Sequence, residues 1–147
     1  MSDPLRIVAA APDHLDQWRE VHNEIIWTSP LSADEVAERA TRNRLTVAYV
    51  GDRLAGCATV RPPAGESRTA TVIVRLLTPF RGRGLGSAYL DVVLRDARSL
   101  DPGRIETVVL SSNADGLAFA HRHGFVEHDR YVVDGETVPF VDLHLPE

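Results

Sequence analysis

The segment Arg81-Gly82-Arg83-Gly84-Leu85-Gly86 combines residue types that suit the binding of an anion. Three glycines alternate with two arginines, and an apolar-periodic segment that predicts a helix follows directly. The first N–H groups of a helix have no intrahelical partner and carry the positive end of the helix dipole. Glycines expose the backbone, and arginines add charge-assisted hydrogen bonds. Continued to Ser87, the segment therefore predicts a site for a phosphate or pyrophosphate group.

Two well-known phosphate-binding loops do not fit this segment. The nucleotide triphosphatase loop requires a lysine, and all 16 basic residues of the chain are arginines. The dinucleotide fingerprint needs one more residue than Gly82-x-Gly84-x-Gly86 provides, and it needs a βαβ unit near the start of the chain. The pattern R-x-x-G-x-G matches from Arg81 to Gly86 at every position. The alternative is an ordinary glycine-rich turn before a helix.

Length and composition favour one globular domain over residues 1–147. Apolar residues make up 44% of the chain and charged residues 25%, which is ordinary for a globular protein. A net charge of −5 and a single occurrence of "RGRG" argue against nucleic-acid binding. The sequence shows neither a signal peptide nor the roughly 20 apolar residues that cross a membrane, so we expect a cytoplasmic protein.

The one cysteine, Cys57, precludes an internal disulfide and a cysteine-rich metal site. We therefore expect no bound metal. A role of Cys57 as an acyl carrier is an alternative to its packing as a small residue within a strand.

Apolar periodicity predicts the element order β-α-α-β-β-β-α-β-α-β-β, which is a mixed α/β sheet. The early strands are expected to be antiparallel, and the later ones to be joined through helices. The expected strands are 5–10, 44–50, 53–61, 68–77, 104–112, 125–133 and 137–145, and the expected helices are 12–25, 29–42, 84–99 and 113–123.

Local signals refine these boundaries. Ser32 and Glu35 have the spacing of a capping box, and Gly124 suits a helix C-terminus. Gly51-Asp52 and Asp134-Gly135 predict hairpin turns, whereas 61–67 reads as a polar loop. For the helix after the glycines we expect a polar stripe and a buried stripe. They comprise Asp91, Arg95, Arg98 and Ser99, and Leu85, Ala88, Tyr89, Val92 and Val93 respectively.

The glycine segment, the strand before it, the helix after it and the later "NADGLAFAHRHGF" resemble the GNAT superfamily of acyl-coenzyme-A-dependent N-acyltransferases. The expected element order agrees along essentially the whole chain. The resemblance implies a mostly antiparallel twisted sheet of six to seven strands with about four helices. It also implies that the central strand and the next parallel strand splay apart to admit the pantetheine arm of coenzyme A.

The resemblance assigns cofactor contacts to this sequence. Pantetheine would contact the backbone of Val74, Arg75 and Leu76, and the Leu76 N–H would polarise the thioester carbonyl. Asn113 would hydrogen-bond the pantetheine arm or cap its helix, and the two roles are compatible. The pyrophosphate would rest on Arg81, Gly82, Arg83, Gly84, Leu85, Gly86 and Ser87.

The sequence departs from the family pattern where proton transfer is expected. The tyrosine that protonates the departing thiolate falls on Ala120, and a glutamate found in some members falls on Val108. Candidate substitutes on the later helix are His123 and His121, because histidine titrates near neutral pH. Glu106, two residues before Val108, could act through water, and Ser111 and Ser112 could hydrogen-bond the thiolate.

His22, Asn23 and Glu24 fall where the family often lines its acceptor site. The leading hypothesis is the transfer of an acetyl group from acetyl-CoA to a small-molecule or peptide amine, by direct attack through a tetrahedral intermediate. A coenzyme-A-binding sensor with weak or no catalysis is the alternative that Ala120 favours. The resemblance also makes a homodimer plausible, with the C-terminal strands as an interface.

Overall fold

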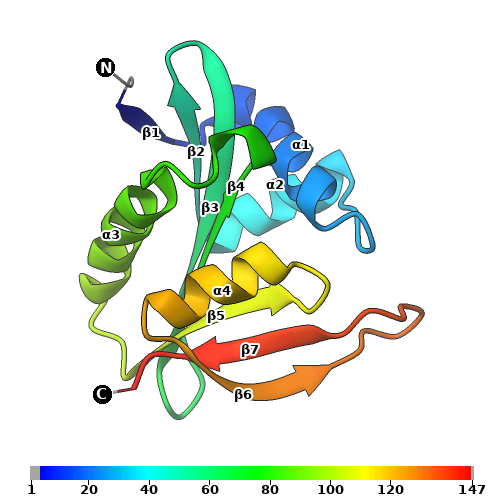
Figure 1. Ribbon diagram of the computed structural model, residues 1–147, viewed down its shortest axis with the longest axis vertical. Coiled ribbons are helices and arrows are strands. Elements are labelled where there is room, and N and C mark those ends of the chain that lie inside the picture. Colours follow the sequence, from blue (N-terminus) through cyan, green and yellow to red (C-terminus); the bar gives the residue numbers. More distant parts are fainter. Residues whose placement is uncertain (1–3, 147) are drawn as a thin grey trace.

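One seven-stranded sheet carries helices on both faces in the computed structural model, which describes residues 4–146 (Figure 1). The strand order is β1-β2-β3-β4-β5-β7-β6, and every neighbouring pair is antiparallel except β4 and β5. The strands are β1 Leu5–Ala9, β2 Arg44–Val50, β3 Arg53–Ala64, β4 Thr69–Leu76, β5 Arg104–Leu110, β6 Val126–Tyr131 and β7 Phe140–His144. The helices are α1 Leu15–Ile25, α2 Ala33–Arg42, α3 Leu85–Arg98 and α4 Ala114–Arg122.

Each face of the sheet has its own hydrophobic core. We name them the α3/α4 core and the α1/α2 core after the helices that cover them. The α3/α4 core includes Ala58, Val60, Val72, Leu76, Tyr89, Leu90, Val93, Ala120, Phe125 and Leu143. The α1/α2 core includes Trp18, Val21, Leu31, Val36, Leu45, Val47, Tyr49 and Cys57. Because side chains alternate between the faces of a strand, β2 and β3 contribute residues to both cores.

The parallel strands β4 and β5 pair only at their beginnings. Thr69, Ala70 and Thr71 lie opposite Arg104, Ile105 and Glu106, and no pairing follows. Figure 1 shows β5 diverging from β4 beyond this point, with α4 packed beside the gap. The expected splay of the two central strands, the mixed sheet and the element order are therefore confirmed.

The capping box of α2 and the glycine at the end of α4 are confirmed. The Glu35 N–H donates to Ser32 Oγ, the Ser32 N–H donates to Glu35 Oε1, and Gly124 has a φ of +88°. Among the described residues, none of the helices is both long and apolar enough to cross a membrane.

Three local expectations are wrong. The predicted loop 61–67 is shorter, because β3 continues to Ala64 through a bulge that contains two prolines, which lack ladder donors. The strands beside Asp134-Gly135 end at Tyr131 and restart at Phe140, so the Asp-Gly turn lies within a longer loop.

The third is the expected buried stripe of α3, which is wrong at two positions. Ala88 and Val92 are exposed, whereas Leu90 and Ala97 are buried. α3 is therefore rotated about its axis, so that the side of the helix facing the sheet differs from the side that periodicity predicts. Tertiary packing selects which apolar residues of a helix face the core, and it does so here against β3 and β4.

Candidate active site

The end of β4 presents its backbone to the gap between the splayed strands. The Leu77 N–H donates to Ala55 O of β3 at 2.8 Å, and backbone groups alternate in direction along an antiparallel strand. The N–H and C=O groups of Val74 and Leu76 therefore point away from β3, toward β5. Those of Arg75 point toward β3 instead, with its carbonyl oxygen beside Gly56. The N–H groups of Val74 and Leu76 thus lie at the edge of the gap, where β4 is not paired with β5.

The glycine segment forms a tight loop before α3. Gly82 and Gly84 have φ values of +77° and +78°, which L side chains rarely adopt. Their N–H groups and that of Arg83 find no backbone acceptor within residues 4–146. The first hydrogen bond of the helix runs from Ala88 N–H to Gly84 O, so the N–H groups of the preceding turn are free as well. Residues Gly82 to Ser87 therefore form a set of backbone N–H donors, which we name the glycine cradle.

Gly86 has a different role from the other two glycines. A Cβ atom at this position would lie 3.0 Å from Phe119 Cε1 of α4. The absence of a side chain therefore lets the start of α3 approach α4 closely. This contact sets the distance between the loop and the helix that forms the opposite wall of the gap.

Arg81 and Asn113 fix the ends of the elements around the gap. Arg81 Nε donates to Leu76 O at 2.9 Å, and its Nη1 lies 3.3 Å from Asp115 Oδ2 at the start of α4. Asn113 Oδ1 accepts from the Gly116 N–H at 3.0 Å, which caps α4. The predicted capping role of Asn113 is thus observed, and its Nδ2 donor is left for another partner.

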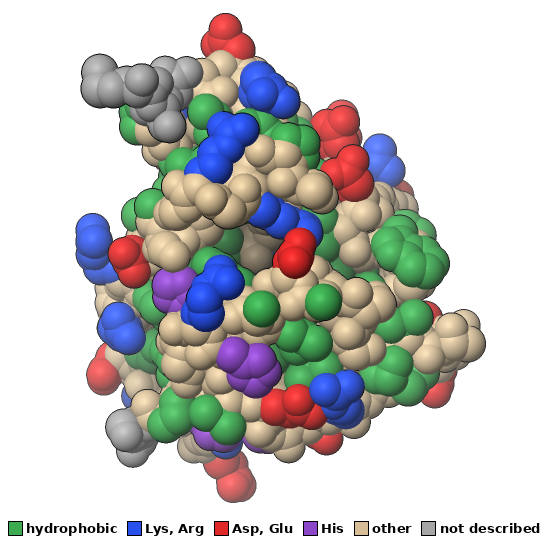
Figure 2. Space-filling view, in the orientation of Figure 1, with side chains coloured by type: hydrophobic (Ala, Val, Ile, Leu, Met, Phe, Trp, Pro, Cys, Tyr) green, Lys and Arg blue, Asp and Glu red, His purple; other side chains and the backbone are tan. Residues whose placement is uncertain are grey.

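A cavity of about 630 Å³ joins the glycine loop to the free edge of β4. Figure 2 shows the hollow on the face that carries α3 and α4, with basic and acidic side chains at its rim. Of the predicted cofactor residues, Val74, Arg75, Leu76, Arg81, Gly82, Gly84, Gly86, Ser87 and Asn113 line it. Arg83 and Leu85 do not: the Arg83 guanidinium lies over the Phe80 ring, and Leu85 packs against the α3/α4 core.

A narrower space of about 50 Å³ continues inward between β4 and β5. Val108 and Ala120 both line it, together with Ile25 and Ile26 at the end of α1. The two positions at which the resemblance would place a base and an acid are therefore adjacent to one pocket, and both are apolar. Ile25, which sequence reasoning missed, lines both spaces and carried no signal beyond an apolar helix position.

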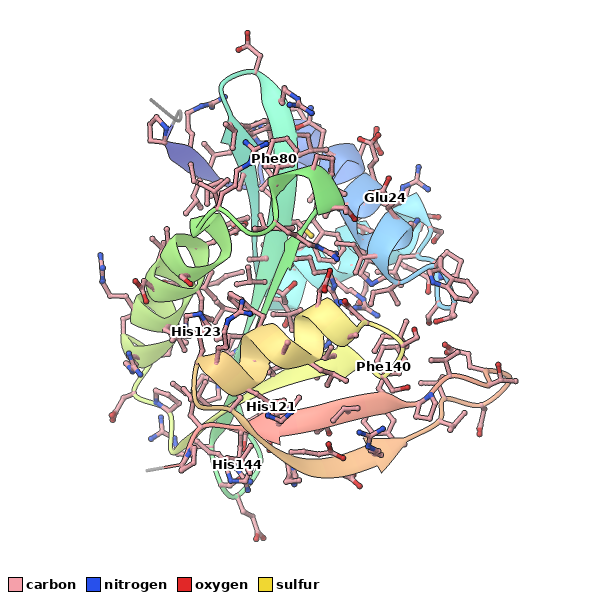
Figure 3. All side chains as sticks on the ribbon, viewed as in Figure 1. Glu24, Phe80, His121, His123, Phe140 and His144 are labelled. Atoms are coloured by element: carbon pink, nitrogen blue, oxygen red, sulfur yellow. The ribbon has the colours of Figure 1, made fainter. Side chains whose placement is uncertain are left out.

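The histidines of α4 do not line either space. His123 Nε2 lies 2.9 Å from Ser87 Oγ, and its ring packs on Phe119 at 4.5 Å between centroids. His121 is exposed. Figure 3 shows both at the C-terminal end of α4, with His123 toward α3 and His121 toward β7. His123 therefore contacts the loop side of the cavity rather than the end of β4.

Glu106 also lies outside the cavity lining, in the paired part of β5. Its carboxylate is 3.5 Å from Arg104 Nε and 3.1 Å from His128 Nε2. Ligand atoms of Glu106, His128 and Asp142 all lie within 4.8 Å of one another, so these three side chains could hold a cation. Burial, followed by repulsion from Glu106, raises the pKa of Asp142.

The three residues predicted to contact an acceptor have side chains in different surroundings. His22 is 4% exposed, stacks on Trp18 and contacts Asn23 Oδ1 through Nδ1 at 2.9 Å. Asn23 exchanges two hydrogen bonds with the backbone of Leu31 and so holds the turn after α1. Glu24 is exposed, and Figure 3 shows it on α1. Burial first, and then the charge of Arg75, lowers the pKa of His22 to about 4.

Cys57 is fully buried in the α1/α2 core, beside Arg75. Burial raises the pKa of its thiol to about 12, so the group is a neutral thiol at physiological pH. Its position agrees with packing as a small core residue.

Solved structures share this fold. A protein provisionally named phosphinothricin N-acetyltransferase is 23% identical with a TM-score of 0.79, over 97% of this chain and 99% of that chain. YncA of Salmonella typhimurium, provisionally named an acetyltransferase and solved with its cofactor acetyl-CoA, is 18% identical with a TM-score of 0.75, over 97% and 94%. The spermidine/spermine N-acetyltransferase SpeG of Vibrio cholerae, in complex with manganese ions, is 17% identical with a TM-score of 0.72, over 97% and 92%.

Sequence comparisons give one positive result. The model of the acetyltransferase (GNAT) family matches residues 9–125. A comparison with curated protein sequences finds no match.

Proposed function

Because the chain belongs to the acetyltransferase (GNAT) family, we propose that it transfers the acetyl group of acetyl-CoA to a primary amine. One observation carries this proposal: a single cavity connects the donor-rich glycine loop to the unpaired edge of β4. The presence of acetyl-CoA in the similar YncA structure supports it.

The fit of the cofactor follows from the donors present. The pyrophosphate binds the free N–H groups of Gly82 to Ser87, where the helix dipole favours negative charge. Pantetheine lies along the gap and pairs with the backbone of Val74, as an added strand would. Asn113 Nδ2 donates to the pantetheine arm, and the Leu76 N–H donates to the thioester carbonyl oxygen.

The reaction forms one bond and breaks one bond. The unprotonated amine nitrogen attacks the thioester carbonyl carbon, and the oxygen that becomes negative is stabilised by the Leu76 N–H. The C–N bond forms, the C–S bond breaks and coenzyme A leaves as a thiolate. The amine nitrogen loses a proton, and the thiolate gains one.

We propose that water carries these protons. Val108 and Ala120 offer no titratable group, and His121, His123 and Glu106 are not among the lining residues of the cavity. Orientation and polarisation of the thioester then supply most of the rate enhancement. If His123 or Glu106 takes part, it acts through bridging water.

A coenzyme-A-binding sensor with little catalysis is the second candidate function. The apolar pair Val108 and Ala120 favours it, because both usual proton-transfer positions lack a titratable group. The acceptor is left open by the similar structures, whose names refer to phosphinothricin and to spermidine or spermine.

Two measurements on the purified chain test the proposal. Calorimetry with coenzyme A and acetyl-CoA measures binding, and release of free thiol with a panel of amines measures transfer. We expect binding and amine-dependent thiol release. Binding without release from any amine would favour the sensor, and the absence of binding at millimolar ligand would exclude both functions.

We also propose a homodimer that forms through the C-terminal strands. β6 is an edge strand, and the apolar side chains Val126, Tyr131, Val132 and Val133 on it and just after it are exposed. Exposed apolar edges favour pairing with another chain. Light scattering on the wild type and on Val132→Glu tests this, since the substitution should shift the dimer to monomer.

A further inference from the structure

Three arginine side chains gather on the face of the sheet that carries α1 and α2. Arg61 lies four residues after Cys57 on β3, and Arg75 lies opposite Cys57 on β4, so all three side chains share that face. Arg39 reaches the same region from α2. Burial lowers the pKa of each guanidinium, and repulsion from Arg61 lowers that of Arg39 and of Arg75 further. We name Arg39, Arg61 and Arg75 the arginine cluster.

The arginine cluster has no counter-ion in the described part of the chain. No carboxylate of residues 4–146 forms an ion pair with any of the three guanidinium groups. Glu35 and Glu38 act on Arg39, and Asp142 on Arg61, only from beyond ion-pair distance. Within the described residues, six other arginines, in contrast, pair with an acid.

Arg75 is the most isolated member of the cluster. The group beside it is the Cys57 thiol, which is neutral, and its neighbour His22 is neutral at physiological pH as well. Arg75 is partly buried, and a charge that is removed from water without a counter-ion destabilises the folded state. A bound anion would remove this destabilisation, so the arrangement is suited to a ligand that carries negative charge.

The position of Arg75 relates this charge to the reaction. Arg75 lines both the large cavity and its narrow continuation, between Val74 and Leu76 whose backbones edge the gap. Its side chain is on the opposite face from α3 and the glycine loop. The Arg75 guanidinium and the glycine loop therefore lie on opposite sides of the proposed thioester position. The guanidinium is on the side from which an acceptor would approach.

We propose that Arg75, with Arg61 and Arg39 behind it, binds a carboxylate of the acceptor, so that the acceptor is an amino acid rather than a polyamine or a neutral amine. A guanidinium binds a carboxylate through two parallel hydrogen bonds, which also orient the ligand. This inference rests on the proposed acetyl transfer, because it names the acceptor class of that reaction.

The first test is a matched panel of acceptors. Thiol release from acetyl-CoA is measured with the amino acids other than cysteine, with their amides, with the corresponding decarboxylated amines and with spermidine. For the preferred side chain we expect kcat/KM of the acid to exceed that of its amide by about ten- to a hundredfold, the usual value of a charged hydrogen bond. In parallel, each compound at millimolar concentration is tested for a rise in Tm of the wild type.

Variants assign the effect to the cluster. Arg75→Gln should raise KM for the acid at least tenfold, and it should raise the Tm of the unliganded protein by removing the unpaired charge. Arg61→Gln is a second variant with a smaller effect in the same direction. Arg95→Gln, at an exposed position of α3 outside the cavity, is the control and should change none of these values.

The outcomes separate this inference from the proposed function. Acetyl-CoA binding is measured without any acceptor, and its absence would remove the proposed function itself. If acetyl-CoA binds but amides, decarboxylated amines or spermidine are acetylated as well as the acids, the carboxylate site is wrong. It is equally wrong if no acid is acetylated and none raises the wild-type Tm.

Discussion

The two sides of the splayed strands present positive charge by different means. On the α3/α4 side, the glycine loop offers main-chain N–H groups, and its geometry depends on Gly82, Gly84 and Gly86. On the α1/α2 side, Arg61 and Arg75 offer guanidinium groups from two different strands. The first site is local in sequence, and the second exists only because β3 and β4 pair in one register.

This difference predicts how each side responds to substitution. A backbone site tolerates changes of side chain but not a change of backbone conformation or the loss of an N–H group. A side-chain site depends on the identity and charge of a few residues.

Leu76→Pro removes the N–H group that we propose polarises the thioester. Because this N–H points away from β3, proline costs no hydrogen bond to that strand. We expect kcat to fall by roughly a hundred- to a thousandfold, as for the loss of one oxyanion donor, while acetyl-CoA binding changes much less.

Leu76→Ala is the matched variant, since it loses the same buried side chain but keeps the N–H group. Leu76→Pro and Leu76→Ala are both assayed under conditions in which circular dichroism shows that they are folded. Equal kcat values for the two variants would exclude a catalytic role of this N–H group.

Gly84→Ala should weaken coenzyme A binding at least tenfold, measured as Kd by calorimetry, because a Cβ atom disfavours the φ of +78° on which the cradle depends. Gly135→Ala is the control: Gly135 has a φ of +85°, a Cβ added there would meet no atom within 4 Å, and the residue does not line the cavity. Both variants should lose similar stability, roughly 1 kcal/mol. A normal Kd for Gly84→Ala would contradict the backbone cradle.

His22 makes the α1/α2 side sensitive to acid. Its folded pKa of about 4 is below the unfolded value of 6.5, so the unfolded state binds more protons between these values. The stability that His22 contributes is present above pH 6.5 and is lost as the pH falls toward 4. Between pH 7.5 and 5.5 we expect a loss of roughly 1.4 kcal/mol in urea unfolding. His22→Gln should reduce this dependence, and an unchanged slope would show that another group causes it.

Asn113 caps α4 and is proposed to donate to the pantetheine arm, and two variants separate these two roles. Asn113→Ala should cost about 1 kcal/mol of stability, because α4 loses its cap. Asn113→Asp keeps a capping oxygen, loses the Nδ2 donor and adds a negative charge, so its stability should stay near that of the wild type while Kd for coenzyme A rises severalfold. A Kd for Asn113→Asp equal to that of the wild type would assign Asn113 to capping alone.

The hairpin that follows α4 shows where local signals fail. Asp134-Gly135 does form a turn, but Val132, Val133 and the residues up to Pro139 do not extend the strands. Likewise, Ala88 and Val92 fit the apolar period of α3 and are nevertheless exposed. Turn chemistry and periodicity describe a segment by itself, whereas strand length and helix rotation depend on the neighbouring elements.

The sequence by itself determined the element order, the mixed α/β sheet and the glycine loop before α3, because caps, periodicity and glycines act over a few neighbouring residues. The splay of β4 and β5 was expected only from the resemblance to the GNAT superfamily. Only the tertiary structure decided that Val108 and Ala120 line the same narrow pocket and that His22 is buried rather than exposed to an acceptor. It alone placed Arg75 beside Cys57 and near Arg61, with no carboxylate of residues 4–146 at ion-pair distance from either guanidinium. Such placements depend on strand register and on the packing of helices against the sheet, and these are set by contacts between residues far apart in the chain.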